Sequence, residues 1–155
     1  MARDDALLVG TAGEHFVAFR LAQLGCVVAI PRGGSPAVDL LVSNRAGTKT
    51  VTVQVKTAEW AQRYRGRGEE KRLDHLEFPL GHRAVGFSPR RFIYAFVDLQ
   101  GREPNSAPDV YIVPAEIVRQ YADEWAHVKW LRYHPPIEEV EPYKNRWRLI
   151  TQLLR

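Results

Sequence analysis

The spacing of apolar residues at the start of the chain predicts a helix followed by a short strand. Across residues 7–24 apolar side chains recur at helical spacing, and Gly25 stands where a left-handed residue would end the helix. Residues 26–30 form a short apolar run that stops at Pro31. We therefore expect one amphipathic helix and then one strand.

Two stretches rich in β-branched and apolar residues, 37–43 and 48–56, predict an antiparallel hairpin that completes a three-stranded meander. The residues between them, 44–47, have suitable turn chemistry. If Ser43 pairs with Thr48, the alternation of side chains places the apolar residues on one face. That face holds Val38, Leu40, Val42, Val51, Val53 and Val55. The opposite face holds Asp39, Thr52, Gln54 and Lys56.

The rest of the chain resumes regular patterning after a long interruption. Periodicity disappears across residues 60–91, where glycines interrupt an arginine-rich segment, and we predict an irregular excursion there. The elements predicted beyond it are strands at 92–99, 109–113 and 127–133 and helices at 114–124 and 137–154. Together the elements predict an α/β domain at residues 1–133, with a mixed β-sheet flanked by helices, and a C-terminal helical extension at 134–155 packed on it.

The amino-acid composition indicates what kind of partner the protein binds and in which cellular compartment it is found. The 155 residues include 22 Lys and Arg against 18 Asp and Glu, a formal net charge of +4, which favours a polyanionic partner because each neutralised phosphate releases counterions. Cys26 is the single cysteine, so it forms no internal disulfide and fits a structural role in a reducing compartment. Acidic residues near Met1 and the lack of a long apolar run favour a soluble cytoplasmic protein.

The polar face of the meander carries a candidate metal site. With Asp39 opposite Thr52, Gln54 lies on the diagonal position roughly 7 Å away, and Lys56 points the same way. Mg²⁺ prefers oxygen atoms of carboxylates, amides and main-chain carbonyls, so Asp39, Gln54 and the Val55 carbonyl form a partial shell. Taken singly, each of these residues is better explained by a solvated or capped position on a strand.

Glu14 adds an acid to the helix face that should lie on the sheet. It falls near the middle of the sector that holds Gly10, Val17 and Leu21. An acid that complements the helix dipole explains it as well as a metal ligand does. The order along the chain is more specific: an acid in the first helix, an acid in the second strand, and Gln-Val-Lys at the end of the third.

These segments resemble the PD-(D/E)XK nuclease superfamily, whose restriction-endonuclease-like core is a helix, a three-stranded meander and further α/β elements. The resemblance covers residues 10–57. It is carried by Gly-Thr-Ala-Gly-Glu at 10–14, Ala-Val-Asp-Leu-Leu-Val at 37–42 and Val-Gln-Val-Lys-Thr at 53–57. The segment 32–35 looks like that of archaeal Holliday-junction resolvases, whereas the Gln-Val-Lys-Thr segment is more similar to bacterial and intron-type members.

The resemblance implies a role for each residue of the candidate site. Glu14 would be an accessory acid, Asp39 the central metal ligand, Gln54 the residue at the second acidic position, and Lys56 the catalytic lysine. The implied protein is a Mg²⁺-dependent DNA endonuclease, with Mn²⁺ as an alternative cation and a homodimer as the expected assembly. The implied reaction is phosphodiester hydrolysis by a metal-activated water.

Gln54 departs from the superfamily pattern, which usually has an acid at this position. The neutral amide removes one negative charge, so metal binding should be weaker. Three alternatives are therefore open. The protein is an active endonuclease, or it is a nucleic-acid-binding module that keeps the fold with weakened catalysis. The third alternative is a protein-interaction domain with no nucleic-acid role.

A cluster of basic residues follows Lys56 closely, with Trp60 and Tyr64 among them. The cluster comprises Arg63, Arg65, Arg67, Lys71 and Arg72. Arginine forks suit phosphates and aromatic rings stack on bases, so substrate contact is one interpretation and a solvated loop is the other. Arg32 and Ser35, before the acidic strand, are the remaining predicted nucleic-acid contacts.

Overall fold

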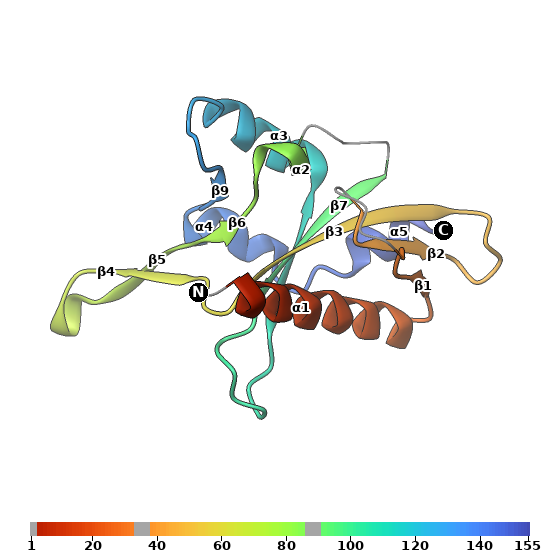
Figure 1. Cartoon of the computed structure of the whole chain (residues 1–155), viewed down its shortest axis with the longest axis horizontal. Coiled ribbons are helices and arrows are strands. Elements are labelled where there is room, and N and C mark those ends of the chain that lie inside the picture. The colour runs from red at the N-terminus through yellow and green to blue at the C-terminus, as the bar shows by residue number, and fades with distance from the viewer. Residues whose placement is uncertain (1–2, 33–37, 86–90) are drawn as a thin grey trace.

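The computed structural model describes residues 3–32, 38–85 and 91–155, and its centre is a five-stranded sheet (Figure 1). In spatial order the strands are β1 (Val27–Ala29), β2 (Leu40–Ser43), β3 (Thr50–Ala58), β7 (Phe92–Asp98) and β8 (Asp109–Pro114). Neighbouring strands are antiparallel except β3 and β7, which are parallel. The predicted antiparallel meander and mixed α/β fold are confirmed, with β3 as the central strand.

Each face of the sheet carries its own hydrophobic core. Helices α1 (Arg3–Gln23) and α5 (Arg148–Leu153) pack on the face that holds the valines of β3. Helix α3 (Ala115–Glu124) packs on the other face, which is rich in Phe and Tyr, and Figure 1 shows α1 and α3 on opposite sides of the sheet. Val17 and Leu21 of α1 are fully buried, and each such side chain contributes about 1.5–3 kcal/mol. This packing holds α1 firmly across β3.

The pairing register of β2 with β3 differs by two residues from the predicted one. Ser43 pairs with Thr50, not with Thr48. The Asn44 side chain accepts hydrogen bonds from the backbone N–H groups of Thr48 and Lys49 (2.9 and 3.3 Å), so the loop is longer than predicted. Because side chains alternate with a period of two, a two-residue shift leaves every side chain on its predicted face.

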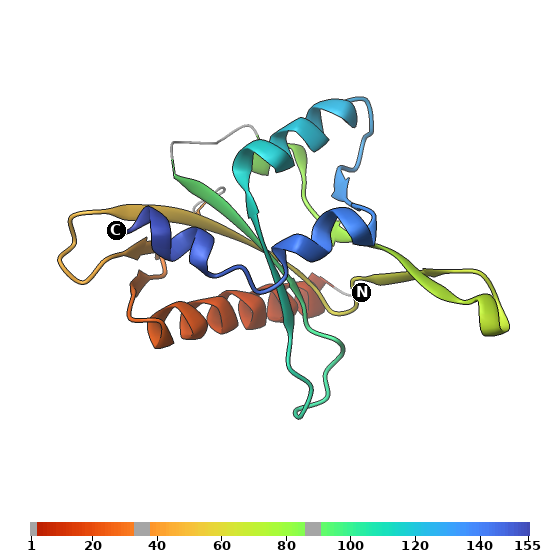
Figure 2. The same ribbon diagram turned by 180° about the vertical axis from the view of Figure 1, so that it is seen from behind.

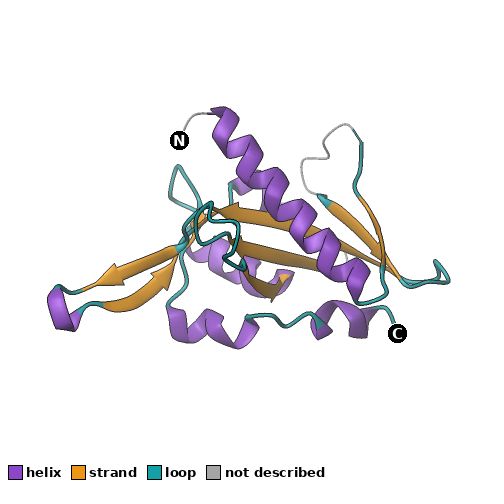
Figure 3. Ribbon diagram, turned by 90° about the horizontal axis from the view of Figure 1, so that it is seen from below, coloured by secondary structure: helices purple, strands orange, loops and turns teal. Residues whose placement is uncertain are grey.

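An arm replaces much of the irregular excursion predicted for residues 60–91. Strands β4 (Gln62–Arg65) and β5 (Arg72–Leu76) pair antiparallel, and the 3-10 turn η1 (Gly68–Glu70) closes the tip. Figures 1 and 3 show the arm projecting away from the sheet. The prediction was wrong here because most side chains of the arm strands are only partly buried or exposed and their burial does not alternate, so no apolar alternation marks the strands.

Short elements connect the arm to the second half of the sheet. They are β6 (Phe78–Pro79), α2 (His82–Val85) and β9 (Arg132–Tyr133), and β6 pairs with β9. The strand predicted at 127–133 is therefore confirmed only in its last two residues. Strands β7 and β8 and helix α3 lie where the sequence predicts them.

The helix predicted at 137–154 is broken into α4 (Ile137–Val140), the 3-10 turn η2 (Glu141–Tyr143) and α5. Asn145 has a positive φ of 53° and donates its N–H to the Val110 carbonyl (2.7 Å), which ties the break to β8. Figure 2 shows this segment running across the strands. In the described parts of the chain, no helix combines the length and the apolar character needed to cross a membrane.

Candidate active site

Asp39 lies directly before β2, and its side chain is tied to the backbone of β3. The Asp39 N–H donates to the Val53 carbonyl (3.2 Å), and the carboxylate Oδ2 accepts a hydrogen bond from the Val55 N–H (2.7 Å). The register that pairs Leu40 with Val53 puts Asp39 level with Gln54 rather than on the predicted diagonal. Two hydrogen bonds to one strand therefore fix this carboxylate beside the polar residues of β3.

Gln54 is almost completely buried although it is polar. Its side chain is 1% exposed, and Oε1 has no hydrogen-bond partner within the described residues. A buried acceptor without a partner costs roughly 1–3 kcal/mol, so such a group in a folded protein needs an explanation. An amide oxygen that serves as a cation ligand provides one.

Lys56 lies two residues further along the same face of β3 and is only partly exposed. Burial lowers its pKa from the ordinary value of 10.5, while the charges of Asp39 and Glu14 act in the opposite direction. Where the structure describes the chain, the Lys56 ammonium forms neither a hydrogen bond nor an ion pair. A nucleic-acid-binding module that has lost catalysis would be expected to hold Lys56 in a structural salt bridge. The described residues do not form such a salt bridge.

Glu14 comes close to this site because α1 approaches β3 closely at Gly13. A Cβ atom at Gly13 would lie 1.9 Å from Thr57 Oγ1, so only glycine permits this approach. Burial raises the pKa of Glu14, and the negative charge of Asp39 raises it further. The pKa of Asp39 is itself raised by burial, against the opposing effects of the Val55 N–H and Lys56. The charge of Asp39 therefore acts on a second partly buried acid, Glu14.

The donor set suits a hard cation better than a softer one. Within the described residues no three His, Cys, Asp or Glu side chains gather as a metal cluster, so a cation here would take two carboxylates and an amide oxygen. The unpartnered Gln54 oxygen and the mutually repelling Glu14 and Asp39 are the features that a bound Mg²⁺ would satisfy. The Val55 N–H is bound to Asp39 at the site. The role of the Val55 carbonyl as a metal ligand is still a prediction from the sequence.

The overall fold has a counterpart among solved structures. The fold resembles that of a bacterial homing endonuclease. The chain aligns with that protein, I-Ssp6803I, with a TM-score of 0.57 and 16% sequence identity, over 94% of this chain and 90% of that one. No protein-family model and no curated protein matches the sequence. At this level of identity the likeness to I-Ssp6803I establishes the fold alone.

The predicted nucleic-acid contacts are distributed over the arm. Arg63 pairs with Glu77 (3.6 Å), and Lys71 lies over the ring of Tyr64, with Nζ 4.9 Å from the ring centre. Arg67 is exposed at the tip of the arm. Arg32 is exposed after β1, whereas Ser35 lies outside the described residues. Residues 62–76 of the arm include five Lys or Arg side chains against three Asp or Glu, so the arm is positively charged.

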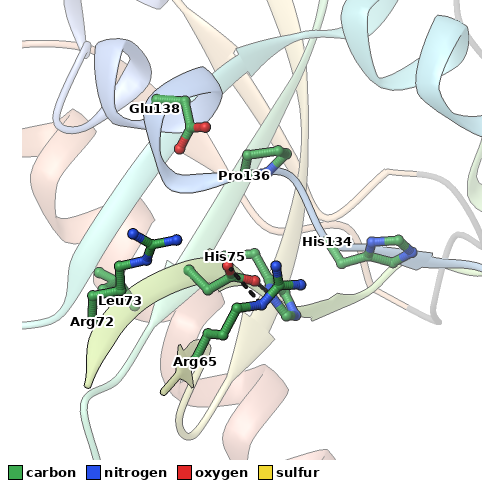
Figure 4. A pocket seen from close by; sticks show the side chains of 8 residues that line it. Arg65, Arg72, Leu73, His75, His134, Pro136 and Glu138 are labelled. Carbon is green, nitrogen blue, oxygen red and sulfur yellow. Dashed lines mark hydrogen bonds and ion pairs between the residues drawn. The ribbon is translucent and has the colours of Figure 1, made fainter. Parts of the chain in front are cut away.

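A cavity of about 740 Å³ lies between the arm and the residues around the start of α4 (Figure 4). Arg65 and Arg72 line it from the arm, and Glu138 lines it from α4. Asp74 forms an ion pair with Arg65 (3.3 Å) and a hydrogen bond with His75 (2.9 Å), and this hydrogen bond lowers the pKa of Asp74. Arg65 is therefore partly neutralised, while Arg72 is left without an ion pair in the described parts of the chain.

Asp98, at the end of β7, has a larger role than the turn-initiating one that its position indicates. It is fully buried, and its Oδ1 accepts hydrogen bonds from the N–H groups of Ala61 (3.0 Å) and Gln100 (3.1 Å). The bond to Gln100 is the expected turn contact, and the bond to Ala61 clamps the segment that follows β3. This second contact joins residues far apart in sequence, so no local pattern could have indicated it.

Asp98→Asn is expected to raise the free energy of unfolding at pH 7 by about 1–2 kcal/mol. Burial raises the pKa of Asp98 above the ordinary 3.8, with a further contribution from Asp109. The carboxyl group therefore favours folding below pH 3.8, and that contribution is lost as the pH rises through the higher pKa of the folded state. The gain of the asparagine variant should disappear on acidification, as urea unfolding at both pH values would measure.

Asp109→Asn is the matched control for this measurement, because Asp109 lies opposite Asp98 on β8 but forms an ion pair with Lys144 (2.8 Å). It should lower stability at pH 7. An Asp98→Asn variant that is less stable than the wild type at neutral pH would show that the two backbone hydrogen bonds outweigh the cost of burying the charge.

Proposed function

We propose that this protein is a metal-dependent DNA endonuclease of the PD-(D/E)XK type, with Gln54 at the second acidic position. The observation that carries the proposal is the junction of β2 and β3, where a carboxylate fixed on the Val55 N–H lies level with a buried, unpartnered amide oxygen and near an unpaired lysine. The likeness of the whole fold to a bacterial homing endonuclease supports it.

Glu14, Asp39, the Gln54 amide and the Val55 carbonyl would hold Mg²⁺, or Mn²⁺ in its place. Asp39 can offer Oδ1, because Oδ2 is occupied by the Val55 N–H. When bound, such a cation polarises the scissile phosphate and offsets the negative charge that develops during hydrolysis. With one amide in place of an acid, the shell carries less negative charge, so we expect weak affinity and a requirement for millimolar cation.

Lys56 acts on the attacking water in this proposal. Its pKa is lowered by burial, so the neutral amine is more available near physiological pH than it is in an exposed lysine. The amine would accept a proton from the water as the water oxygen attacks phosphorus and the P–O bond to the leaving strand breaks. The resulting ammonium would then face the developing charge, and the leaving oxygen would take up a proton from solvent. Asp39 and Glu14 favour the protonated form, which aids the second half of this cycle.

The arm would bind the DNA backbone on either side of the site. Arg67 and Arg72 are the side chains best placed for phosphate, since neither forms an ion pair within the described residues. Arg63, Arg65 and Lys71 already contact other groups of the arm and would contribute less. The segment before β2 that contains Arg32 and Ser35 is proposed as a further contact.

Incubation of the purified protein with supercoiled, linear and branched DNA tests the proposal. We expect cleavage with Mg²⁺ or Mn²⁺, none with a chelator, and a loss of at least about 100-fold in Asp39→Asn. Asparagine keeps an acceptor for the Val55 N–H and removes only the charge. Asp123→Asn, an exposed acid on α3, is the matched control.

Each outcome of this assay has a distinct meaning. Cleavage that survives Asp39→Asn would remove Asp39 from the site. If no substrate is cut and salt-sensitive DNA binding persists, the binding module with weakened catalysis becomes the better description. If DNA is neither cut nor bound, the protein-interaction alternative stands. Sedimentation with and without DNA would test the proposed homodimer, which a monomer under both conditions would contradict.

A further inference from the structure

A cavity of about 910 Å³ begins one residue beyond Lys56 and belongs to none of the roles described so far. Its walls come from the end of β3, from the segment around β6 and α2, and from the residues that lead into β9. Figure 1 shows these elements on the side of the sheet that also carries α3. The cavity thus continues the face of β3 on which Gln54 and Lys56 lie.

Trp60, on one wall, is both exposed and rigidly placed. Its side chain is 56% exposed, although indoles in soluble proteins usually pack inward. Gly101 lies directly under the ring, where a Cβ atom would come within 2.6 Å of Trp60 Cζ2. The Gly101 N–H donates to the Glu59 carbonyl (2.8 Å), and Asp98 holds the Ala61 N–H (3.0 Å). Contacts on both sides of Trp60 therefore fix an aromatic surface that faces solvent.

Trp130 lies on another wall of the same cavity and is 78% exposed. Lys129 Nζ lies 5.7 Å from the centre of its ring, a cation–π contact that keeps a positive charge beside the indole. Seventy positions of the chain separate Trp60 from Trp130, and only the tertiary fold brings them to one cavity. Two large indoles left in solvent at one site indicate a ligand with flat, stackable groups.

The charge of the lining indicates an anionic ligand. The lining has four Lys or Arg residues against two carboxylates, Glu59 and Glu77. Glu77 is paired with both Arg63 and Arg132, and Glu59 is paired with Arg102 (3.1 Å), so neither carboxylate is free to repel an anion. The two remaining cations of the lining, Arg83 and Lys129, form no ion pair with any described residue.

We infer that this cavity binds an unpaired nucleotide of the substrate, with its base held by the indole rings of both Trp60 and Trp130 and its phosphate paired with Arg83 or Lys129. A base inside a duplex has both faces covered by its neighbours, so only a single-stranded or extruded base can use an indole platform. The substrate class that follows is DNA in which a single-stranded segment, such as an overhang or gap, adjoins a duplex. This inference rests on the proposed function, because it places that segment beside the cleavage site.

Binding measured with a chelator present, so that no cleavage occurs, tests the inference. The probes are a blunt duplex and the same duplex with a short thymine overhang at its 5′ or its 3′ end, and fluorescence anisotropy reports affinity. The wild type should prefer one overhang to the blunt duplex. Trp60→Ala and Trp130→Ala should each weaken overhang binding by roughly 5- to 100-fold and leave blunt-duplex binding unchanged.

Three controls separate stacking from other effects. Trp60→Phe retains an aromatic ring and should recover most of the preference. Arg67→Gln with Arg72→Gln on the arm should weaken both probes alike and leave the preference intact. Trp130 is so exposed that its replacement should not disturb the fold, and thermal unfolding checks that Trp60→Ala is folded.

The outcomes distinguish this inference from the proposed nuclease function. Equal affinity for blunt and overhang probes, or alanine variants that bind the overhang like the wild type, would overturn the nucleotide pocket while leaving the cleavage assay untouched. Preference for the overhang, lost in both alanine variants, would support the pocket even if no DNA were cut with Mg²⁺ present. In that case the proposed catalysis would fail and the binding site would remain.

Discussion

Lys56→Met is expected to lower the rate of DNA cleavage at least about 100-fold and, at the same time, to raise the free energy of unfolding. Burial lowers the pKa of Lys56 even though Asp39 and Glu14 act to raise it, so the charged amine opposes folding at neutral pH. Methionine has a similar length and no charge. If Lys56 is the proton acceptor of the proposed function, its loss removes catalysis, whereas loss of the buried charge removes a cost to the fold.

The sign of the stability effect has a pH dependence that can be measured. Because the pKa of Lys56 in the folded state lies below the ordinary 10.5, the cost of the charged amine is largest at low pH and fades as the pH rises toward 10.5. The stability gain of Lys56→Met should shrink in the same direction. Lys49→Met, in the loop before the other end of β3, is the control and should change cleavage little. A Lys56→Met enzyme that cuts within a few-fold of the wild-type rate would exclude the lysine from the chemistry.

Replacing a residue of an active site is expected to lower activity and raise stability when that residue is unfavourable for folding. The same reasoning applies to Gln54, whose buried Oε1 lacks a partner, and to the two acids with raised pKa values. Each of these groups costs folding free energy, and a solvated or structural role would not require that cost. The concentration of such groups at the junction of β2 and β3 is stronger support for a functional site than any one of them.

The fold around the site was readable from the sequence because one face of β3 is apolar and the other is largely polar. The valines of β3 alternate with polar residues, and this alternation survives a register error of two residues without moving any side chain to the wrong face. The error arose in the loop, where the Asn44 side chain binds two backbone N–H groups and lengthens the connection. The turn chemistry of the loop therefore led to a wrong prediction of the pairing register. The prediction of which side chains share a face of the sheet was not affected.

Features created by contacts between distant residues could not be predicted. Apart from Leu76, the side chains of the arm strands are exposed or only partly buried, so these strands lack the alternation that marks a strand within a sheet. The cavity between Trp60 and Trp130 depends on elements seventy positions apart, and the clamp from Asp98 to Ala61 depends on β7 lying parallel to β3. The four residues of the candidate site could be proposed from the sequence only because they lie on neighbouring elements at the start of the chain.

Gly13→Ala is expected to destabilise the protein by about 1–3 kcal/mol, although alanine has a higher helix propensity than glycine. Alanine favours a helix interior over glycine by about 1 kcal/mol, so propensity alone predicts a more stable α1. The added Cβ would lie 1.9 Å from Thr57 Oγ1 and 2.9 Å from both Thr57 Cβ and Cγ2, distances that force α1 away from β3. The displacement would carry Glu14 with it, so cleavage should fall together with the free energy of unfolding from urea titrations.

A second substitution at Thr57 decides whether the close approach is the cause. Thr57→Ala removes Oγ1 and Cγ2, two of the three atoms that the new Cβ would meet, and Oγ1 is a buried hydroxyl without a partner in the described residues. Combined with Gly13→Ala, it should restore part of the lost stability and activity, a coupling that a double-mutant cycle measures. Thr57→Val keeps atoms at the same positions and should restore neither. If the two substitutions are simply additive, α1 tolerates a Cβ at residue 13, and the position of Glu14 does not depend on the glycine that precedes it.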